Sequence, residues 1–144
     1  MNVDKYFSLA KKASQFSNFC GKTTSRHTGC VIVYKNNVVG VGWNIDKEHP
    51  LQKKYNKERG FNPDCCKNSL HAEMYALVKS EGLDIDWEKA AIFTYRQYAN
   101  LLPAMARPCR ACMAAIKDRG IKNIYYTTEY GWANEVLDEQ VCDY

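Results

Sequence analysis

The feature that most constrains this fold is a pair of predicted helix starts that both carry metal-binding side chains. The stretch "HAEMYAL" begins at His71, and "PCRACMAAIKDRG" begins at Pro108. The span between His71 and Cys109 accommodates one helix, one crossing strand and a return loop. Both helix N-termini can therefore meet at one edge of a sheet, which is where α/β folds place their functional sites.

The side chains at these helix starts form a set of three metal ligands. Cys109 and Cys112 are three residues apart and share one helical face. A helix N-terminus lowers the pKa of a thiol and favours the thiolates that metals bind. With His71 they make three ligands, and three protein ligands with an open fourth position are typical of a catalytic zinc. A thioredoxin-like redox motif fits less well, because "QYANLLPAMA" separates Cys109 from the preceding predicted strand.

Glu73 stands two residues after His71, in the first turn of the same predicted helix. It could simply complement the helix dipole, and a histidine there is often solvated. However, H-x-E followed by P-C-x-x-C is the signature of zinc deaminases. We therefore interpret Glu73 as a proton carrier that faces the open metal position.

Hydrophobic periodicity predicts the remaining elements. A helix is expected over 3–16, followed by an antiparallel hairpin of strands 30–35 and 38–44 with a turn at Asn36-Asn37. Residues 45–68 are predicted to be a long polar loop. A helix over 69–82, a strand over 90–96, a helix over 108–120 and a strand over 121–128 follow. Residues 132–140 predict a short closing helix, and a brief fifth strand could form near Val141.

This order predicts an α/β fold with helices on both faces of one mixed sheet, a three-layer α/β/α arrangement. Strands separated by helices imply right-handed parallel crossovers. We find no internal repeat and no interdomain linker in the sequence, so residues 1–144 are expected to form a single domain.

The composition limits the environment and the partners. Apolar residues make up 46% and charged residues 25%, as in ordinary globular domains. The N-terminus lacks the apolar core of a signal peptide, and no apolar run approaches the ~18 residues of a membrane span. Seven cysteines, an odd number, then indicate thiol or metal chemistry in a cytoplasmic protein. The net charge of +4 suits a phosphate-bearing ligand and does not require nucleic acid.

Three stretches resemble the cytidine deaminase superfamily: "SRHTGCVIVYKNNVVGVGWN", "HAEMYAL" and "ARPCRACMAAIKDRGIKNIYYTT". The chain looks most like the deoxycytidylate deaminase branch with its phage and bacterial relatives, over about residues 22–128. The resemblance implies a cytidine-deaminase-like mixed sheet of four to five strands and a homo-oligomer. It also implies Zn²⁺ held by His71, Cys109 and Cys112, Glu73 as the proton shuttle, and Asn44 near the substrate.

The other candidate substrate-binding residues carry alternatives. Asn44 could bind a sugar hydroxyl or base edge, or could simply end its strand. Basic residues of the long loop, above all Lys53 and Lys54, could bind phosphate or form a solvated face. Arg26 has the same two readings, and Arg96 could reach the ligand or cap a carbonyl. Cys20, His49, Cys65 and Cys66 could hold a second zinc, although buried free thiols are the ordinary alternative.

The function expected from these residues is zinc-dependent hydrolytic deamination of a cytosine nucleotide, of the dCMP to dUMP type, with release of ammonia. The alternatives are deamination of a free nucleoside or of a base in single-stranded DNA or RNA, which would need a groove with stacking aromatic residues. A zinc module without turnover is a third hypothesis, against which Glu73 argues. The expected partner is a small-molecule nucleotide, rather than a nucleic acid or a membrane.

Overall fold

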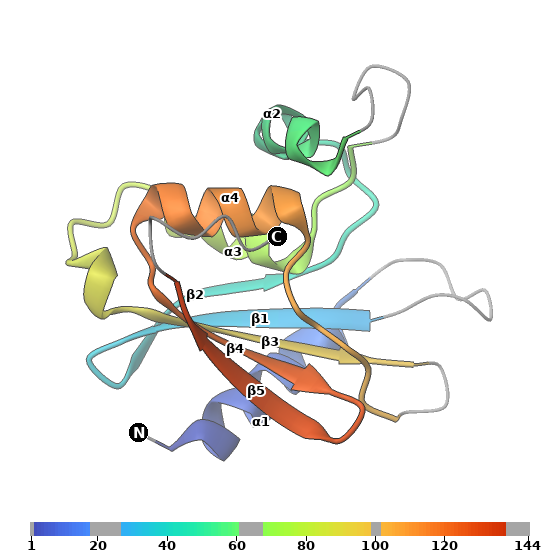
Figure 1. Cartoon of the computed structure of the whole chain (residues 1–144), viewed down its shortest axis with the longest axis vertical. Helices are drawn as coiled ribbons and strands as arrows, with labels where there is room; N and C mark the ends of the chain where they lie inside the picture. Colours follow the sequence, from blue (N-terminus) through green and yellow to red (C-terminus); the bar gives the residue numbers. More distant parts are fainter. Residues whose placement is uncertain (1, 18–26, 61–67, 99–101, 138–144) are drawn as a thin grey trace.

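The protein is built around a five-stranded mixed sheet with the strand order β2-β1-β3-β4-β5 (Figure 1). The computed structural model describes residues 2–17, 27–60, 68–98 and 102–137. The strands are β1 (His27–Tyr34), β2 (Asn37–Trp43), β3 (Ala91–Gln97), β4 (Asn123–Thr128) and β5 (Gly131–Val136). β3 and β4 are parallel, and every other neighbouring pair is antiparallel. The predicted mixed sheet, beginning with an antiparallel hairpin, is confirmed.

Helices cover both faces of this sheet, which confirms the predicted three layers (Figure 1). α1 (Val3–Ser14) lies on one face, and α3 (Ala72–Lys79) and α4 (Arg110–Arg119) lie on the other. α2 (Pro50–Asn56) lies outside α3 and α4 and continues into the 3-10 turn η1 (Lys57–Arg59). A second 3-10 turn, η3 (Trp87–Lys89), precedes β3.

The central strands are apolar on both faces because each face is covered by helices. Successive residues of β1 alternate between two cores: Val31 packs toward α1, whereas Ile32 packs toward α3 and α4. On the α1 side, the rings of Tyr6 and Phe7 contact Phe93, with centroids 5.3 and 5.4 Å away. The sheet is thus fixed from both sides around the strands that lead to the helix starts.

Two glycines of the hairpin allow the helices to approach the sheet closely. A Cβ atom at Gly29 would collide with the carbonyl oxygen of Ala10 in α1. A Cβ atom at Gly42 would collide with the backbone of Ala72 and Ala76 in α3. Close packing of α3 on β2 therefore depends on the missing side chain at Gly42.

The hairpin turn lies one residue earlier than predicted. The residues with positive φ are Lys35 (49°) and Asn36 (63°), and Tyr34 pairs with Asn37 across the ladder. Two central residues with positive φ match the right-handed twist of a hairpin. The predicted turn at Asn36-Asn37 is therefore wrong by one position, because Lys35 adopts the left-handed conformation beside Asn36.

Two predicted assignments of secondary structure are wrong. The region 45–68, predicted as a loop, contains α2, which starts with His49 as its N-cap and Pro50 in its first turn. Residues 132–140 were predicted as a helix, but Gly131–Val136 forms β5, paired antiparallel with β4. Pairing with β4 outweighs the helix propensity of this segment. The alternative strand near Val141 lies outside the described residues.

The other elements agree with the prediction apart from their ends. α3 spans Ala72–Lys79 rather than 69–82, and α4 spans Arg110–Arg119 rather than 108–120. Gly120 ends α4 in the left-handed conformation, with φ of 101°. Within the part of the chain that the structure describes, no helix has the length and apolar content needed to cross a membrane.

Candidate metal centre and its pocket

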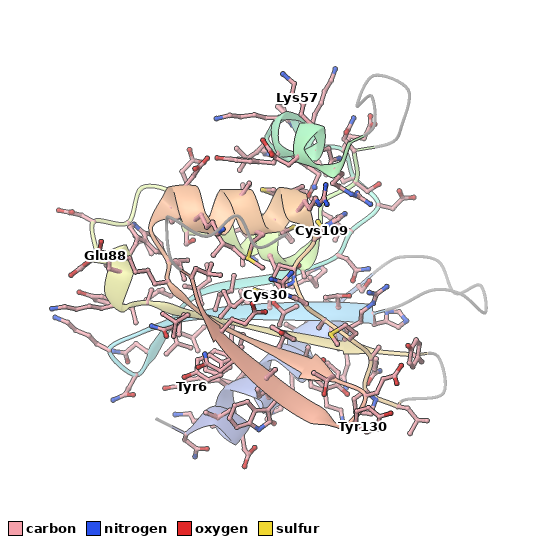
Figure 2. The ribbon with its side chains drawn as sticks, viewed as in Figure 1. Tyr6, Cys30, Lys57, Glu88, Cys109 and Tyr130 are labelled. Atoms are coloured by element: carbon pink, nitrogen blue, oxygen red, sulfur yellow. The ribbon has the colours of Figure 1, made fainter. Side chains whose placement is uncertain are left out.

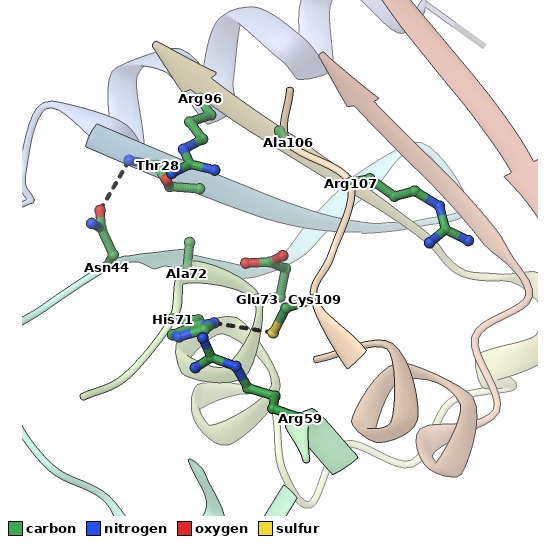
Figure 3. Close-up of a pocket in the computed structure, with 10 residues that line it drawn as sticks. All are labelled: Thr28, Asn44, Arg59, His71, Ala72, Glu73, Arg96, Ala106, Arg107 and Cys109. Carbon is green, nitrogen blue, oxygen red and sulfur yellow. Dashed lines mark hydrogen bonds between the residues drawn. The ribbon is translucent and has the colours of Figure 1, made fainter. Parts of the chain in front are cut away.

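The sheet topology brings the starts of α3 and α4 together. β2 and β3 both run antiparallel to β1, which lies between them, so their carboxyl ends lie at the same edge. The chain leaves β2 toward the start of α3, and it leaves β3 toward the start of α4. The predicted meeting of the two helix N-termini at one sheet edge is confirmed (Figure 3).

His71, Cys109 and Cys112 form a compact group at this edge. His71 is the N-cap of α3, Cys109 is the N-cap of α4, and Cys112 lies in the first turn of α4. The Nδ1 atom of His71 is 3.4 Å from each cysteine sulfur, and all three ligand atoms lie within 4.8 Å of one another. A tetrahedral zinc site separates a nitrogen ligand from a sulfur ligand by about 3.5 Å. The three residues therefore fit a zinc ion bound through Nδ1 and two sulfurs.

The electrostatics of the group favour metal binding. The hydrogen bond from Cys112 lowers the pKa of Cys109 to about 3 against the effect of burial, and His71 contributes in the same direction. The Cys112 thiol accordingly has its pKa raised, by that hydrogen bond and by burial. Burial lowers the pKa of His71, but the bond to Cys109 and its charge outweigh burial and raise it. The surroundings of Cys109 thus favour its thiolate form, which is the form that a metal binds.

Glu73 is a buried carboxyl group beside these ligands, with only 5% of its surface exposed. Burial raises its pKa to about 7, and the nearby Cys109 thiolate adds to the shift. A carboxyl group with this pKa can take up and release a proton near neutral pH. Its environment is that of an acid–base group rather than of a solvated helix end.

The group opens into a pocket of about 330 Å³ (Figure 3). Four parts of the chain line it. They are the hairpin of β1 and β2, the turn η1 that follows α2, the start of α3, and the segment from β3 to the start of α4. Its lining residues are Thr28, Asn44, Arg59, His71, Ala72, Glu73, Arg96, Ala106, Arg107 and Cys109. His71, Cys109 and Glu73 therefore face a space large enough for a small ligand.

Two of the predicted substrate-binding residues line this pocket, and each also has a structural contact. Asn44 follows β2, and its Oδ1 accepts a hydrogen bond from the backbone N–H of Thr28 at 2.9 Å. Arg96, near the end of β3, donates to the carbonyl of Met105 at 3.4 Å. These positions are compatible with both alternatives for each residue. Asn44 could end its strand or contact a ligand, and Arg96 could cap a carbonyl or contact a ligand.

The other predicted candidates either are not among the residues that line the pocket or fall outside the described residues. Lys53 and Lys54 are exposed on α2 and are not among its lining residues. Figure 2 shows Lys57, the next basic residue, on the same outlying helical arm. Arg26 lies outside the described residues, as do Cys20, Cys65 and Cys66 of the hypothetical second zinc site. His49 caps α2, since its Nδ1 accepts from the backbone N–H of Leu51 at 3.0 Å.

Sequence reasoning did not select two polar residues of the lining, Thr28 and Arg107, and it considered Arg59 only as one of the basic residues of the long loop that could bind phosphate. Arg59 is the last residue of η1, and Arg107 directly precedes the Pro-Cys motif. Arg107 makes a bidentate pair with Glu135 of β5, at 2.7 and 3.1 Å. The position of Arg107 directly before the Pro-Cys motif could have indicated that it lies near the site. The spacing of Arg59 did not distinguish it from the other basic residues of the same segment.

A family model supports the zinc assignment. The model described as "Cytidine and deoxycytidylate deaminase zinc-binding region" matches residues 1–128 of the chain. This match, with the placement of His71, Cys109 and Cys112, identifies the cofactor as zinc. No curated protein matches the sequence.

Solved structures with a similar fold include enzymes from a phage and from bacteria. The dCMP deaminase from the cyanophage S-TIM5 in apo form is 23% identical, with a TM-score of 0.58 over 88% of this chain and 82% of that one. The same enzyme in complex with dCMP and dUMP is 24% identical, with a TM-score of 0.56 over 87% of this chain and 79% of that one. Cytidine deaminase from Burkholderia pseudomallei is 16% identical, with a TM-score of 0.62 over 94% and 93%. At these identities the likeness establishes the fold.

Proposed function

Because the chain belongs to the family of cytidine and deoxycytidylate deaminases, we propose that it hydrolyses the exocyclic amine of a cytosine nucleotide. The reaction would be of the dCMP to dUMP type, with one water consumed and one ammonia released. The observation that carries this proposal is Glu73, a buried carboxyl group with a raised pKa in the same pocket as His71 and Cys109.

The proposed roles follow from the position of each group. His71, Cys109 and Cys112 hold the zinc, which when bound supplies the Lewis acidity that activates water near neutral pH. Glu73 accepts a proton from the attacking water and delivers it to the ring nitrogen of the base. It then carries a proton to the departing amine, so that ammonia leaves and Glu73 returns to its starting state.

Glu73 is suited to several proton transfers in one turnover. Among the described residues that line the pocket, it is the only carboxyl group. Burial disfavours the charged carboxylate and raises its pKa, which suits a group that takes up protons as well as releasing them. A carboxyl group with an ordinary pKa near 4.3 would release its proton too readily to protonate an amine efficiently.

The charge of the pocket favours a nucleotide over a nucleoside. Arg59, Arg96 and Arg107 line it, although the charge of Arg107 is paired with Glu135. Arginine binds phosphate through a planar set of donors and stays charged at all physiological pH values. Thr28, which pairs with Arg96 across the β1–β3 ladder, and Asn44 add hydrogen-bonding groups for the sugar or base (Figure 3).

The test is ammonia release by the zinc-loaded protein from a panel of substrates. The panel contains cytidine, deoxycytidine, their monophosphates and triphosphates, adenosine, guanine and single-stranded DNA. We expect the highest kcat/KM with dCMP. Equal values for deoxycytidine and dCMP would refute phosphate recognition, and highest activity on DNA would favour the nucleic-acid alternative. A folded, zinc-loaded protein without turnover on any member would indicate a zinc module without catalysis.

A further inference from the structure

We propose that Gln52 is a positioning residue for the metal ligand His71, acting through a buried chain of side-chain amides. We call this chain, formed by Gln52, Asn56 and Asn68, the amide relay. All three side chains are buried, with 0%, 1% and 5% of their surface exposed. The inference rests on the proposed role of His71 as a zinc ligand, and it concerns how the surrounding chain holds that ligand.

The first link joins the relay to the metal ligand. The Oε1 atom of Gln52 accepts the backbone N–H of His71 at 3.0 Å. The Nε2 atom of Gln52 donates to Oδ1 of Asn56 at 2.8 Å. Both ends of the Gln52 amide are therefore used, and only one orientation of the amide satisfies them.

The second link anchors the relay to the segment that leads into α3. The Nδ2 atom of Asn56 donates to Oδ1 of Asn68 at 2.9 Å. The backbone of Asn68 is held in turn, since its N–H donates to Glu48 at 3.1 Å and its carbonyl accepts from His49 at 3.3 Å. The relay thus connects α2 to the chain on both sides of it.

The position of the relay distinguishes it from ordinary core packing. Leu51 and Tyr55 of the same helix pack against the apolar core, so the relay is not the only attachment of α2. Buried amides are costly unless each hydrogen bond is made, so a satisfied chain of them specifies one geometry. Here the specified atom is the N–H of His71, the residue whose Nδ1 lies 3.4 Å from both cysteine sulfurs.

The relay also ties the metal ligand to one side of the substrate pocket. Arg59, which lines the pocket, lies on η1, directly after the relay residue Asn56. Gly60 ends this turn in the left-handed conformation, with φ of 79°. One short segment of chain thus supports both the backbone of His71 and the placement of Arg59. Metal retention should therefore respond to substitution of the relay residues.

The test compares zinc release from the zinc-loaded full chain of Gln52→Leu and of the parent protein, measured with a chromogenic chelator. Removing groups that orient a metal ligand typically weakens metal binding by about 10–100-fold. We expect zinc release to be faster by about that factor and the visible spectrum of the Co²⁺-substituted protein to change. Asn56→Leu, one link further away, should give a smaller acceleration.

The matched control is Ser80→Ala, at the opposite end of α3. Ser80 is also buried, and its hydroxyl donates to the carbonyl of Ala76 at 2.8 Å. This variant loses a buried hydrogen bond on the same helix, but it should release zinc at the parental rate.

Parental zinc release and an unchanged cobalt spectrum in Gln52→Leu would refute the positioning role, whatever happens to turnover. If Gln52→Leu does not fold, Gln52→Glu serves in its place with Asn56→Leu, because glutamate still accepts from His71 but cannot donate to Asn56. Parental release in both would refute the proposal. The release measurements do not depend on a substrate, so failure of the proposed deamination would appear separately, as a zinc-loaded parent that deaminates no cytosine compound.

Discussion

The floor and the rim of the pocket are built in different ways. The pocket floor consists of His71, Glu73 and Cys109, which come from the N-caps and the first turn of two helices. The pocket rim consists of Arg59, Arg96 and Arg107, which come from η1, from β3 and from the connection before α4. The floor is organised by two short motifs, whereas each rim arginine depends on a separate part of the fold.

This difference teaches what local sequence can determine. Helix starts place the floor side chains by backbone geometry that a short motif already specifies. The rim is determined by which side of a helix or strand faces the pocket in the folded protein. Lys54 and Arg59 lie close together in the sequence, yet only Arg59 lines the pocket. If the contrast is correct, floor substitutions should abolish chemistry and rim substitutions should change affinity.

The largest effect is expected from the floor. Glu73→Gln should retain zinc, since the three ligands are intact, but should lower kcat by at least the roughly 10²–10⁴-fold typical of acid–base groups. His71→Ala should lose zinc and activity together. The measurement is zinc content by elemental analysis beside kcat for each variant. Loss of zinc in Glu73→Gln would make Glu73 a ligand or a support of the ligands, and near-normal turnover would make it helix decoration.

A smaller effect is expected at the rim. Arg59→Ala should raise KM for a cytosine monophosphate by roughly tenfold, the value of one charge-assisted hydrogen bond. KM for the nucleoside should change little, because a nucleoside has no phosphate for Arg59 to contact. For the nucleotide the effect should appear in KM rather than in kcat, because a phosphate contact binds the ground state and the transition state equally. Lys54→Ala is the matched control, an exposed charge on the same arm that lies outside the lining. Equal shifts for nucleotide and nucleoside would show that Arg59 does not contact phosphate.

The smallest effect concerns the rim arginine that is tied to the sheet. Arg107 lowers the pKa of Glu135, and the hydroxyl of Tyr126, which donates to Glu135 at 2.7 Å, assists it against burial. A lowered carboxyl pKa stabilises the fold above the ordinary value near 4.3, and that stability is lost as the pH falls through the folded-state pKa. Glu135→Gln should therefore cost about 1 kcal/mol at pH 7 and less in acid.

Urea unfolding at pH 7 and at acid pH measures this prediction. Glu88→Gln is the control, because its pair with Lys122 at 3.5 Å is mostly exposed, with 63% of the Glu88 side chain accessible. That variant should change the free energy of unfolding little at either pH. If Glu135→Gln lowered the free energy of unfolding equally at both pH values, the charge of Glu135 would not be the source of its stabilising effect.

The sequence allowed the floor and the central sheet to be predicted because their signals are local. The apolar runs of β1 and β3 reflect burial on both faces, and the Cys109/Cys112 spacing reflects one helical turn. Gly120 marked the end of α4, and it adopts the expected left-handed conformation. Each of these signals can be recognised from residues that are close together in the sequence.

The remaining features depend on distant partners. The residues of β5 have no strand signal of their own, and they pair because β4 presents an open edge. α2 lies in a polar stretch with few apolar residues, and its inner side is specified by amides such as Gln52 rather than by a hydrophobic stripe. Local propensity carries no information about such contacts. The Pro50 signal at the first helical turn was the one available clue.

The glycine contact beneath α3 has a consequence for engineering the enzyme. Gly42 sets how deeply the helix that carries Glu73 sits on the sheet, and a methyl group there would collide with the backbone of Ala72. Enlarging the pocket by shifting α3 outward would therefore disturb Glu73 and the metal ligand His71 together. Replacing rim side chains leaves that contact untouched, since none of the three rim arginines lies on α3. Redesign of substrate preference is therefore best directed at the rim arginines, while the hairpin glycines Gly29 and Gly42 are kept unchanged.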